Sequence, residues 1–96
     1  MNFKNQSVLI TGGAQGIGFS LSKKFSAIGA NVIIADKHKE TPNIAKQFGG
    51  FGYICDVTKE KELNSFITFG EEKLGEVNCF ISNAGTIFVD PDHVAS

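Results

Sequence analysis

The sequence predicts an α/β fold, in which a parallel sheet carries helices on both of its faces. Short aliphatic runs alternate along the 96 residues with longer segments whose apolar residues recur at helical spacing. A glycine-rich turn at residues 12–18 joins the first aliphatic run to the first helical segment. Alternation of this kind favours parallel strands joined by right-handed crossovers. A chain of this length forms at most one small domain.

The first strand and the first helix flank the glycine-rich turn. Val8, Leu9 and Ile10 form the strand, and their aliphatic side chains suit burial on both faces of a sheet. The helix after the turn is expected to end at Gly29. Its inner face is expected to consist of four apolar residues at helical spacing: Ile17, Leu21, Phe25 and Ile28.

The next elements repeat this alternation. A second strand over residues 31–35 is followed by Asp36. Thr41 and Pro42 begin a short helix, with Thr41 as its cap and Pro42 in the first turn, where a missing N–H is tolerated. A third strand is expected over residues 51–55, because the run is apolar and follows two glycines.

The last helix and strand complete the predicted order. A third helix is expected from about Thr58 to Gly75. Gly70 lies on its inner face and weakens an isolated helix by about 1 kcal/mol, unless close packing requires glycine there. A fourth strand is expected over residues 77–82.

The glycine-rich turn also carries a functional pattern. Gly12, Gly16 and Gly18 let the backbone turn sharply, approach a ligand closely and bring the helix against the first strand. The amino terminus of that helix offers N–H groups and the positive end of the helix dipole, which favour a pyrophosphate. For the glycines alone, a plain strand-to-helix connector is the alternative interpretation.

Asp36 favours the ligand-binding interpretation. It stands eighteen residues after Gly18, at the end of the second strand. An acidic residue at about this distance is placed to accept hydrogen bonds from the ribose of an adenosine. The turn and the acid together predict a dinucleotide site.

We therefore expect residues 1–85 to form a partial dinucleotide-binding domain of the Rossmann type, truncated after the fourth strand, with strand order 3-2-1-4. Residues 86–96 are expected to be an irregular tail, because they show no sustained period and contain the turn signal Asp90-Pro91-Asp92. The apolar fourth strand would then have an unpaired edge. Such an edge predicts a homo-oligomer or a second chain that completes the sheet.

These residues resemble the short-chain dehydrogenase/reductase family. The stretch from Thr11 to Gly18 is similar to the family's Thr-Gly-x-x-x-Gly-x-Gly cofactor motif, and Asp36 matches the position that selects NAD. Asp56-Val57 matches the family's acidic-plus-apolar pair at the adenine pocket, and Asn83-Ala84-Gly85 matches its Asn-Ala-Gly turn after the fourth strand. The cofactor-binding residues that the resemblance implies are Gly12, Gln15, Gly16, Ile17, Gly18, Asp36, Lys37, Asp56, Val57, Asn83, Ala84 and Gly85.

The resemblance implies NAD as the cofactor in preference to NADP. Asp36 would accept hydrogen bonds from the ribose hydroxyls, and its charge would repel the additional phosphate of NADP. Lys37 and Lys39 would soften this preference by meeting that phosphate, although a solvated turn is the alternative interpretation. Asp56 would accept a hydrogen bond from the adenine amino group and Val57 would pack beside the ring, although an aspartate there also suits a helix start.

Hydride transfer, as the resemblance implies it, needs a serine and a Tyr-x-x-x-Lys pair, whose lysine lowers the pKa of the tyrosine. The chain has one tyrosine, Tyr53, and Val57 stands where the lysine would be. We therefore expect no catalytic residue and an oxidoreductase portion that is inactive alone. The alternatives are a non-catalytic nucleotide-binding or interaction module, and one half of a split oxidoreductase.

Composition argues against several other classes. Nine basic and ten acidic residues give a net charge of −1, which attracts neither nucleic acid nor an anionic membrane. No apolar run is long enough to span a membrane and the amino terminus lacks a signal-peptide pattern, so a cytoplasmic location is expected. Cys55 and Cys79 are expected to be buried free thiols, and His38 and His93 to be solvated, so no metal site is expected.

Overall fold

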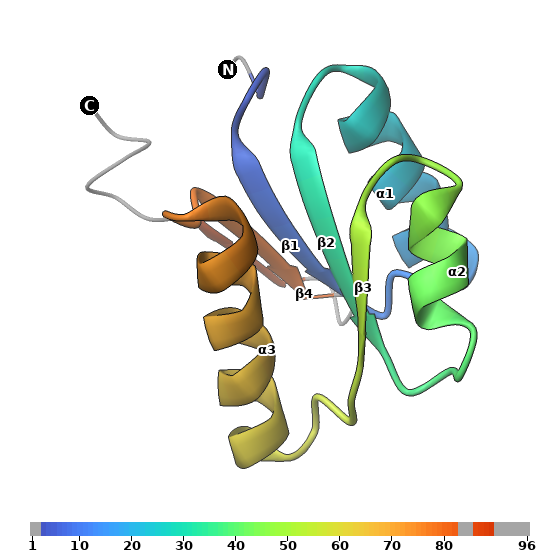
Figure 1. Ribbon diagram of the computed structural model, residues 1–96, viewed down its shortest axis with the longest axis vertical. Coiled ribbons are helices and arrows are strands. Elements are labelled where there is room, and N and C mark those ends of the chain that lie inside the picture. The colour runs from blue at the N-terminus through green and yellow to red at the C-terminus, as the bar shows by residue number, and fades with distance from the viewer. Residues whose placement is uncertain (1–2, 83–85, 90–96) are drawn as a thin grey trace.

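The computed structural model describes residues 3–82 and 86–89. Its elements follow in the order β1 (Ser7–Thr11), α1 (Gly16–Ala27), β2 (Asn31–Asp36), α2 (Thr41–Lys46), β3 (Phe51–Ile54), α3 (Glu60–Leu74), β4 (Cys79–Ser82) and β5 (Thr86–Val89). Figure 1 shows three layers, with α3 on one side of a twisted sheet and α1 and α2 on the other.

The sheet has the order β3-β2-β1-β4-β5 over the described strands. β1 pairs in parallel with both β2 and β4, and β2 pairs in parallel with β3. The predicted parallel sheet of order 3-2-1-4, with helices on both faces, is therefore confirmed. The loops that follow β1, β2 and β3 all leave the sheet at the same edge, since the three strands run in one direction.

β5 departs from the prediction of an irregular tail over residues 86–96. Thr86–Val89 pairs antiparallel with β4, so the prediction that the fourth strand has an unpaired edge is wrong as well. The run consists of β-branched and aromatic residues, which suit a strand, and pairing satisfies the backbone groups along β4. Four residues are too few to show a period in the sequence. The rest of the predicted tail, residues 90–96, lies outside the described residues.

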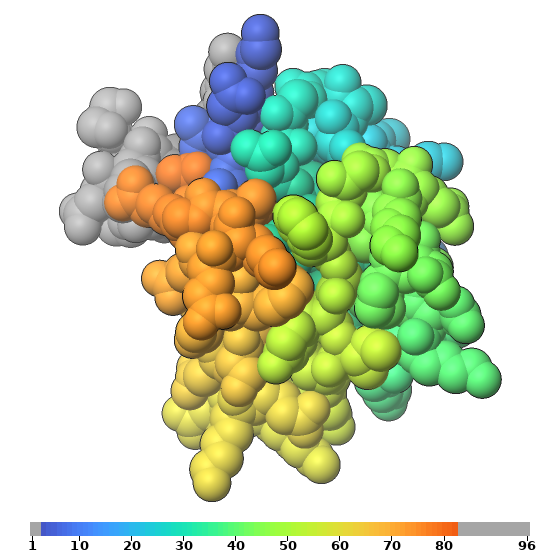
Figure 2. Space-filling view, in the orientation of Figure 1, coloured from blue at the N-terminus to red at the C-terminus, as the bar shows by residue number. Residues whose placement is uncertain are grey.

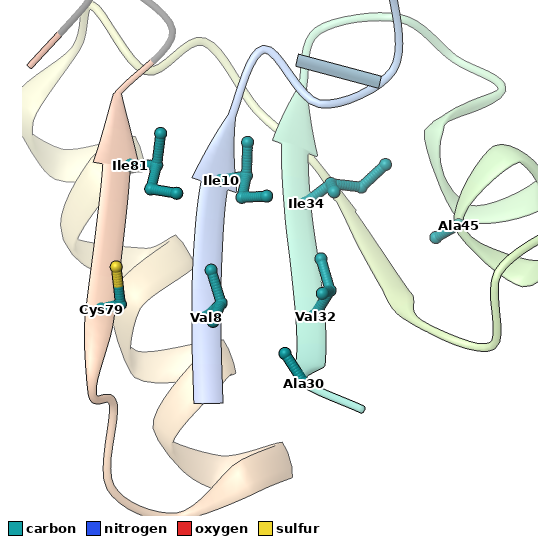
Figure 3. Packing of buried hydrophobic residues seen from close by; sticks show 8 residues of the cluster. All are labelled: Val8, Ile10, Ala30, Val32, Ile34, Ala45, Cys79 and Ile81. Carbon is teal, nitrogen blue, oxygen red and sulfur yellow. The ribbon is translucent and has the colours of Figure 1, made fainter. Parts of the chain in front are cut away.

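Alternate residues of the central strands pack on opposite faces of the sheet. On the face toward α1 and α2, Figure 3 shows buried side chains from three neighbouring strands: Val8, Ile10, Val32, Ile34, Cys79 and Ile81. On the opposite face, Leu9 and Ile33 pack with Phe66 of α3, and all three are fully buried. Burial on both faces explains why these strands are aliphatic without alternation.

α1 packs on the sheet through small residues. Gly18 and Ser22 are buried, whereas Ile17 is 74% exposed and Ile28 is 56% exposed. The prediction that Ile17 and Ile28 belong to the inner face of α1 is therefore wrong. Leu21 and Phe25, the two residues predicted between them, do pack against the core. The helix lies so close to the sheet that only small side chains fit at the first point of contact.

Gly70 is required by the packing of α3. A Cβ atom at this position would lie 2.7 Å from Cδ2 of Leu9, which is fully buried in β1. A side chain at this position would therefore force the buried Leu9 side chain out of its place in the core. This is the close-packing case that the sequence left open.

Neither of two helices begins where its threonine predicts: α2 begins one residue earlier and α3 begins later. α2 has Thr41 as its first residue and not as its cap, and the Thr41 hydroxyl donates to the carbonyl oxygen of His38 at 2.5 Å. α3 begins at Glu60, and Thr58 donates instead to Asp56. Both hydroxyls therefore stabilise the loop that precedes the helix.

Replacing Phe66 by alanine should lower the free energy of unfolding by about 3–5 kcal/mol, because a fully buried ring leaves a cavity under α3. Urea denaturation followed by far-UV circular dichroism measures the change. Ile54→Ala serves as the control, since Ile54 is 50% exposed and should cost about 1 kcal/mol or less. Equal losses in the two variants would contradict the core assigned to this face.

Candidate functional site

The loops after β1, β2 and β3 enclose a cavity at the edge of the sheet where these strands end. Its volume is about 180 Å³, and its lining residues are Gly12, Asp36, Lys37, Cys55, Asp56, Val57 and Thr58. Five of these seven, all except Cys55 and Thr58, are among the residues for which the sequence predicts contact with a cofactor. Ligands of open parallel sheets bind at this end of the strands.

A larger hollow of about 360 Å³ lies elsewhere, between β3 and α3, which lie side by side on the face that Figure 2 shows. Tyr53 and Phe69 line it, and their rings pack with centroids 4.9 Å apart. The Tyr53 ring also stacks on Phe66, at 6.1 Å. Tyr53 is thus part of an aromatic cluster under α3 and does not line the cavity at the strand ends.

The glycine turn forms the floor of the site. Gly12 and Gly16 have φ angles of 67° and 53°, which favour glycine. The N–H groups of Gly12 and Gly13 both donate to the carbonyl oxygen of Ala35, at 2.7 and 3.3 Å. A Cβ atom on Gly18 would lie 2.0 Å from the carbonyl oxygen of Gly12. The turn is therefore hydrogen-bonded to β2 and packs closely against the start of α1.

The amino terminus of α1 suits an anion. Its N-cap residue, Gln15, makes no side-chain cap hydrogen bond, and the first turn contains no acidic residue. The first turn of α3, by contrast, contains Glu60 and Glu62. N–H groups at a helix start that no side chain caps, together with the helix dipole, favour a bound phosphate. The structure places both Gln15 and Ile17 at this helix start with exposed side chains.

Asp36 connects the glycine turn to the loop after β2. Its Oδ2 accepts a hydrogen bond from the N–H of Ala14 at 3.2 Å, and its Oδ1 accepts one from the N–H of His38 at 3.2 Å. The carboxylate lines the cavity, and the exposed Lys37 lies beside it. The sequence did not predict the contacts with Ala14 and His38, because nothing in a linear motif identifies backbone donors.

Asp56 is held by the residue two positions later. Its Oδ1 accepts hydrogen bonds from the Thr58 hydroxyl at 2.6 Å and from the Thr58 N–H at 3.0 Å. The side-chain hydrogen bond from Thr58 is the main reason that the pKa of Asp56 lies below 3.8, its ordinary value, and the backbone bond adds to the effect. The Asp-x-Thr spacing is the sequence signal for this arrangement.

Cys55 is a buried free thiol at the back of the cavity, as the sequence predicts. Burial and the nearby carboxylates of Glu62, Asp56 and Asp36 raise its pKa to about 11. Cys79, also a buried free thiol, has its pKa raised by burial. Both side chains are therefore neutral at ordinary pH and behave as small apolar groups.

The remaining residues predicted for the site add nothing to it within the described part of the chain. Asn83, Ala84 and Gly85 lie outside the described residues. Over residues 3–82 and 86–89, no group of three or more His, Cys, Asp or Glu side chains is placed to hold a metal ion. Nor is any helix within these ranges long and apolar enough to cross a membrane.

The residues at the cavity fit the adenosine half of a dinucleotide in their chemistry. The uncapped helix start and the glycine turn suit a pyrophosphate, and a carboxylate at the end of β2 suits ribose hydroxyls. The close contact of Gly18 with Gly12 is the packing that this type of turn requires. Fold and site together define an α/β protein of the Rossmann type with a nucleotide-binding edge.

Comparison with known proteins identifies the family. A family model described as short chain dehydrogenase matches residues 6–96, and the chain belongs to that family. The structure is similar to 3-ketoacyl-(acyl-carrier-protein) reductase from Brucella melitensis, which was crystallised in complex with NADH. The TM-score is 0.78 and the identity 27%, over 81% of this chain and 33% of that one.

Curated relatives come from plants and bacteria. Short-chain dehydrogenase reductase 3b of Arabidopsis thaliana is 42% identical over 84 residues, which are 83% of this chain and 33% of the relative. The chloroplastic chlorophyll(ide) b reductase NOL of rice is 34% identical over 83% of this chain and 26% of its own length. The 7alpha-hydroxysteroid dehydrogenase of Escherichia coli K12 is 33% identical over 88% of this chain and 36% of its own. The chain thus spans about a third of the length of these relatives.

Gly18→Ala should destabilise the protein, because the added methyl group would overlap the backbone carbonyl of Gly12. We expect a loss of about 1–3 kcal/mol or more, which lowers the melting temperature of so small a domain by at least about 5 °C. Ser20→Ala, on the exposed side of the same helix, is the matched control and should leave it nearly unchanged. An unaltered melting temperature in Gly18→Ala would contradict the close approach.

Thr58→Val should raise the pKa of Asp56 toward 3.8, because it removes the side-chain donor and keeps the backbone donor. A carboxyl group whose pKa is lowered by folding adds stability above its unfolded pKa, and that stability is lost as the pH falls through the folded pKa. The variant should therefore lose less stability between neutral and acidic pH. Carbon-detected NMR titration of the Asp56 carboxyl group measures the pKa, and an unchanged value would refute the assignment.

Proposed function

We propose that the chain binds the adenosine half of NAD, and binds NADP more weakly, as the cofactor-binding portion of an oxidoreductase. In this proposal the pyrophosphate lies on the glycine turn and the start of α1, and Asp36 accepts hydrogen bonds from the ribose, with Lys37 beside it. Asp56 and Val57 receive the adenine. Asn83, Ala84 and Gly85 are proposed as neighbours of the cofactor on sequence grounds alone.

The hydrogen bond between the Ala14 N–H and Asp36 Oδ2, at 3.2 Å, carries the proposal. It holds the acid at the end of β2 against the glycine turn, so the groups proposed for the ribose and for the pyrophosphate lie next to each other. The NADH complex of the similar Brucella reductase supports the choice of a nicotinamide dinucleotide. The negative charge of Asp36 favours ribose hydroxyls over a ribose phosphate.

We further propose that these 96 residues do not transfer hydride by themselves. The single tyrosine lies under α3, in an aromatic cluster away from the strand-end cavity, and Val57 stands four residues after it. The chain also spans only about a third of its relatives. A split oxidoreductase, in which another polypeptide supplies the acid–base groups, is the second candidate on these two observations.

Isothermal titration calorimetry with NAD, NADP and AMP tests the cofactor proposal. Asp36→Asn should weaken NAD binding about tenfold or more, because it removes a charged acceptor, and should narrow the difference between NAD and NADP. Glu72→Gln makes the same change of charge on the exposed side of α3 and should leave both affinities unchanged. Absence of NAD and AMP binding at millimolar concentration would refute the proposal.

A further inference from the structure

We propose that Glu62 is a positioning residue for the adenine subsite. Its carboxylate fixes the backbone of Asp56, and so sets where the Asp56 carboxylate meets the base. The inference rests on the proposed function, because it assigns a role toward the adenine of a bound NAD. Neither the glycine motif nor the acid at the end of β2 includes this residue.

The contact is short and reaches across the loop. Glu62, in the first turn of α3, accepts a hydrogen bond from the N–H of Asp56 at its Oε1, with a distance of 2.8 Å. One residue earlier, the N–H of Cys55 donates to the carbonyl oxygen of Asp36 at 3.1 Å. Two consecutive N–H groups at the start of the loop are thus hydrogen-bonded to different elements: that of Cys55 to β2 and that of Asp56 to α3.

Asp56 is bound through each of its polar groups. Its N–H donates to Glu62, its carbonyl oxygen accepts from the N–H of Lys59 at 3.1 Å, and its Oδ1 accepts from Thr58. Glu62 and Lys59 both belong to the start of α3, and Thr58 lies just before it. α3 thus holds the backbone of Asp56 on two sides, and Thr58 then sets the direction of the side chain. Removing the Glu62 side chain breaks the side-chain hydrogen bond to the Asp56 N–H and leaves the backbone bond from Lys59.

This geometry differs from an ordinary helix cap. An acid at the third position of a helix usually reaches back to the N–H of the N-cap residue, which in α3 is Lys59. Glu62 instead reaches Asp56, six residues back. The bond thus contributes to the shape of the cavity wall as well as to the start of the helix.

The charges around Glu62 make a carboxylate at this position unfavourable unless it has a specific partner. Glu62 lies near two other carboxylates, and all three act on the Cys55 thiol. Like charges that surround the same group repel one another. Lys59, whose Nζ is 3.9 Å from Glu62 Oε2, is too exposed to offset much of this repulsion. The hydrogen bond from the N–H of Asp56 gives an oxygen acceptor at this position a specific use despite that repulsion.

The test compares NAD with nicotinamide hypoxanthine dinucleotide, in which oxygen replaces the adenine amino group. A carboxylate that accepts from that amino group favours NAD, by about tenfold for a charged hydrogen bond. Glu62→Ala should weaken NAD binding about three- to tenfold and change binding of the hypoxanthine dinucleotide by less than about twofold. The preference for NAD over the hypoxanthine dinucleotide, which is the ratio of the two affinities, should therefore fall. Calorimetry measures both ligands with the same protein.

Two further variants separate positioning from general destabilisation. Glu62→Gln keeps an oxygen acceptor and should keep the ratio within about twofold of wild type. Glu60→Ala removes an exposed acid from the same helix turn and should leave the ratio unchanged. Amide hydrogen exchange gives an independent readout without ligand, since the Asp56 N–H should exchange faster in Glu62→Ala and not in Glu62→Gln.

The outcomes distinguish the two proposals. Absence of NAD binding in the wild type refutes the proposed function. NAD binding with an unchanged ratio in Glu62→Ala refutes only the role of Glu62. NAD binding with no preference over the hypoxanthine dinucleotide in the wild type refutes the contact between Asp56 and the adenine amino group, and with it the role of Glu62, but leaves NAD binding itself standing. Equal exchange rates of the Asp56 amide in wild type and Glu62→Ala would also overturn it.

Discussion

The approach of Gly18 to the carbonyl oxygen of Gly12 is the constraint on which the rest of the structure depends. It allows α1 to begin directly against the end of β1, with no room for a side chain between them. The same turn donates two backbone hydrogen bonds to Ala35, which fixes β1 and β2 relative to each other at the edge that carries the cavity. An uncapped helix start, two parallel strand ends and an acid are thus brought together by one contact between backbones.

The two aspartates that line the cavity are held in place by hydrogen bonds with neighbouring residues. Asp36 binds N–H groups on either side of itself in space, and Asp56 is bound by Thr58 and Glu62. These bonds set the directions of two carboxylates before any ligand arrives, which lowers the entropy lost on binding. Cys55, which is buried and neutral, adds an apolar group to the lining of the same cavity.

Much of the fold could be predicted from the sequence, because aliphatic runs, a glycine-rich turn and an acid at these spacings are typical of a parallel α/β sheet that binds a nucleotide. The strand order and the place of Asp36 were predictable in this way. Features set by three-dimensional contact were not. The outward direction of Ile17 follows from how close α1 lies to the sheet, and β5 forms because β4 offers an apolar edge to a run of only four residues. The link from Glu62 to Asp56 joins two segments whose separation in space no motif encodes.

The aromatic cluster under α3 has a practical consequence. The chain contains no tryptophan and one tyrosine, and that tyrosine packs against Phe66 and Phe69. Its ultraviolet emission is therefore an intrinsic probe of how α3 is docked, free of any stronger emitter in the same polypeptide. Because this ring does not line the strand-end cavity, its emission reports whether α3 is packed on the sheet. It does not report whether the cavity is occupied.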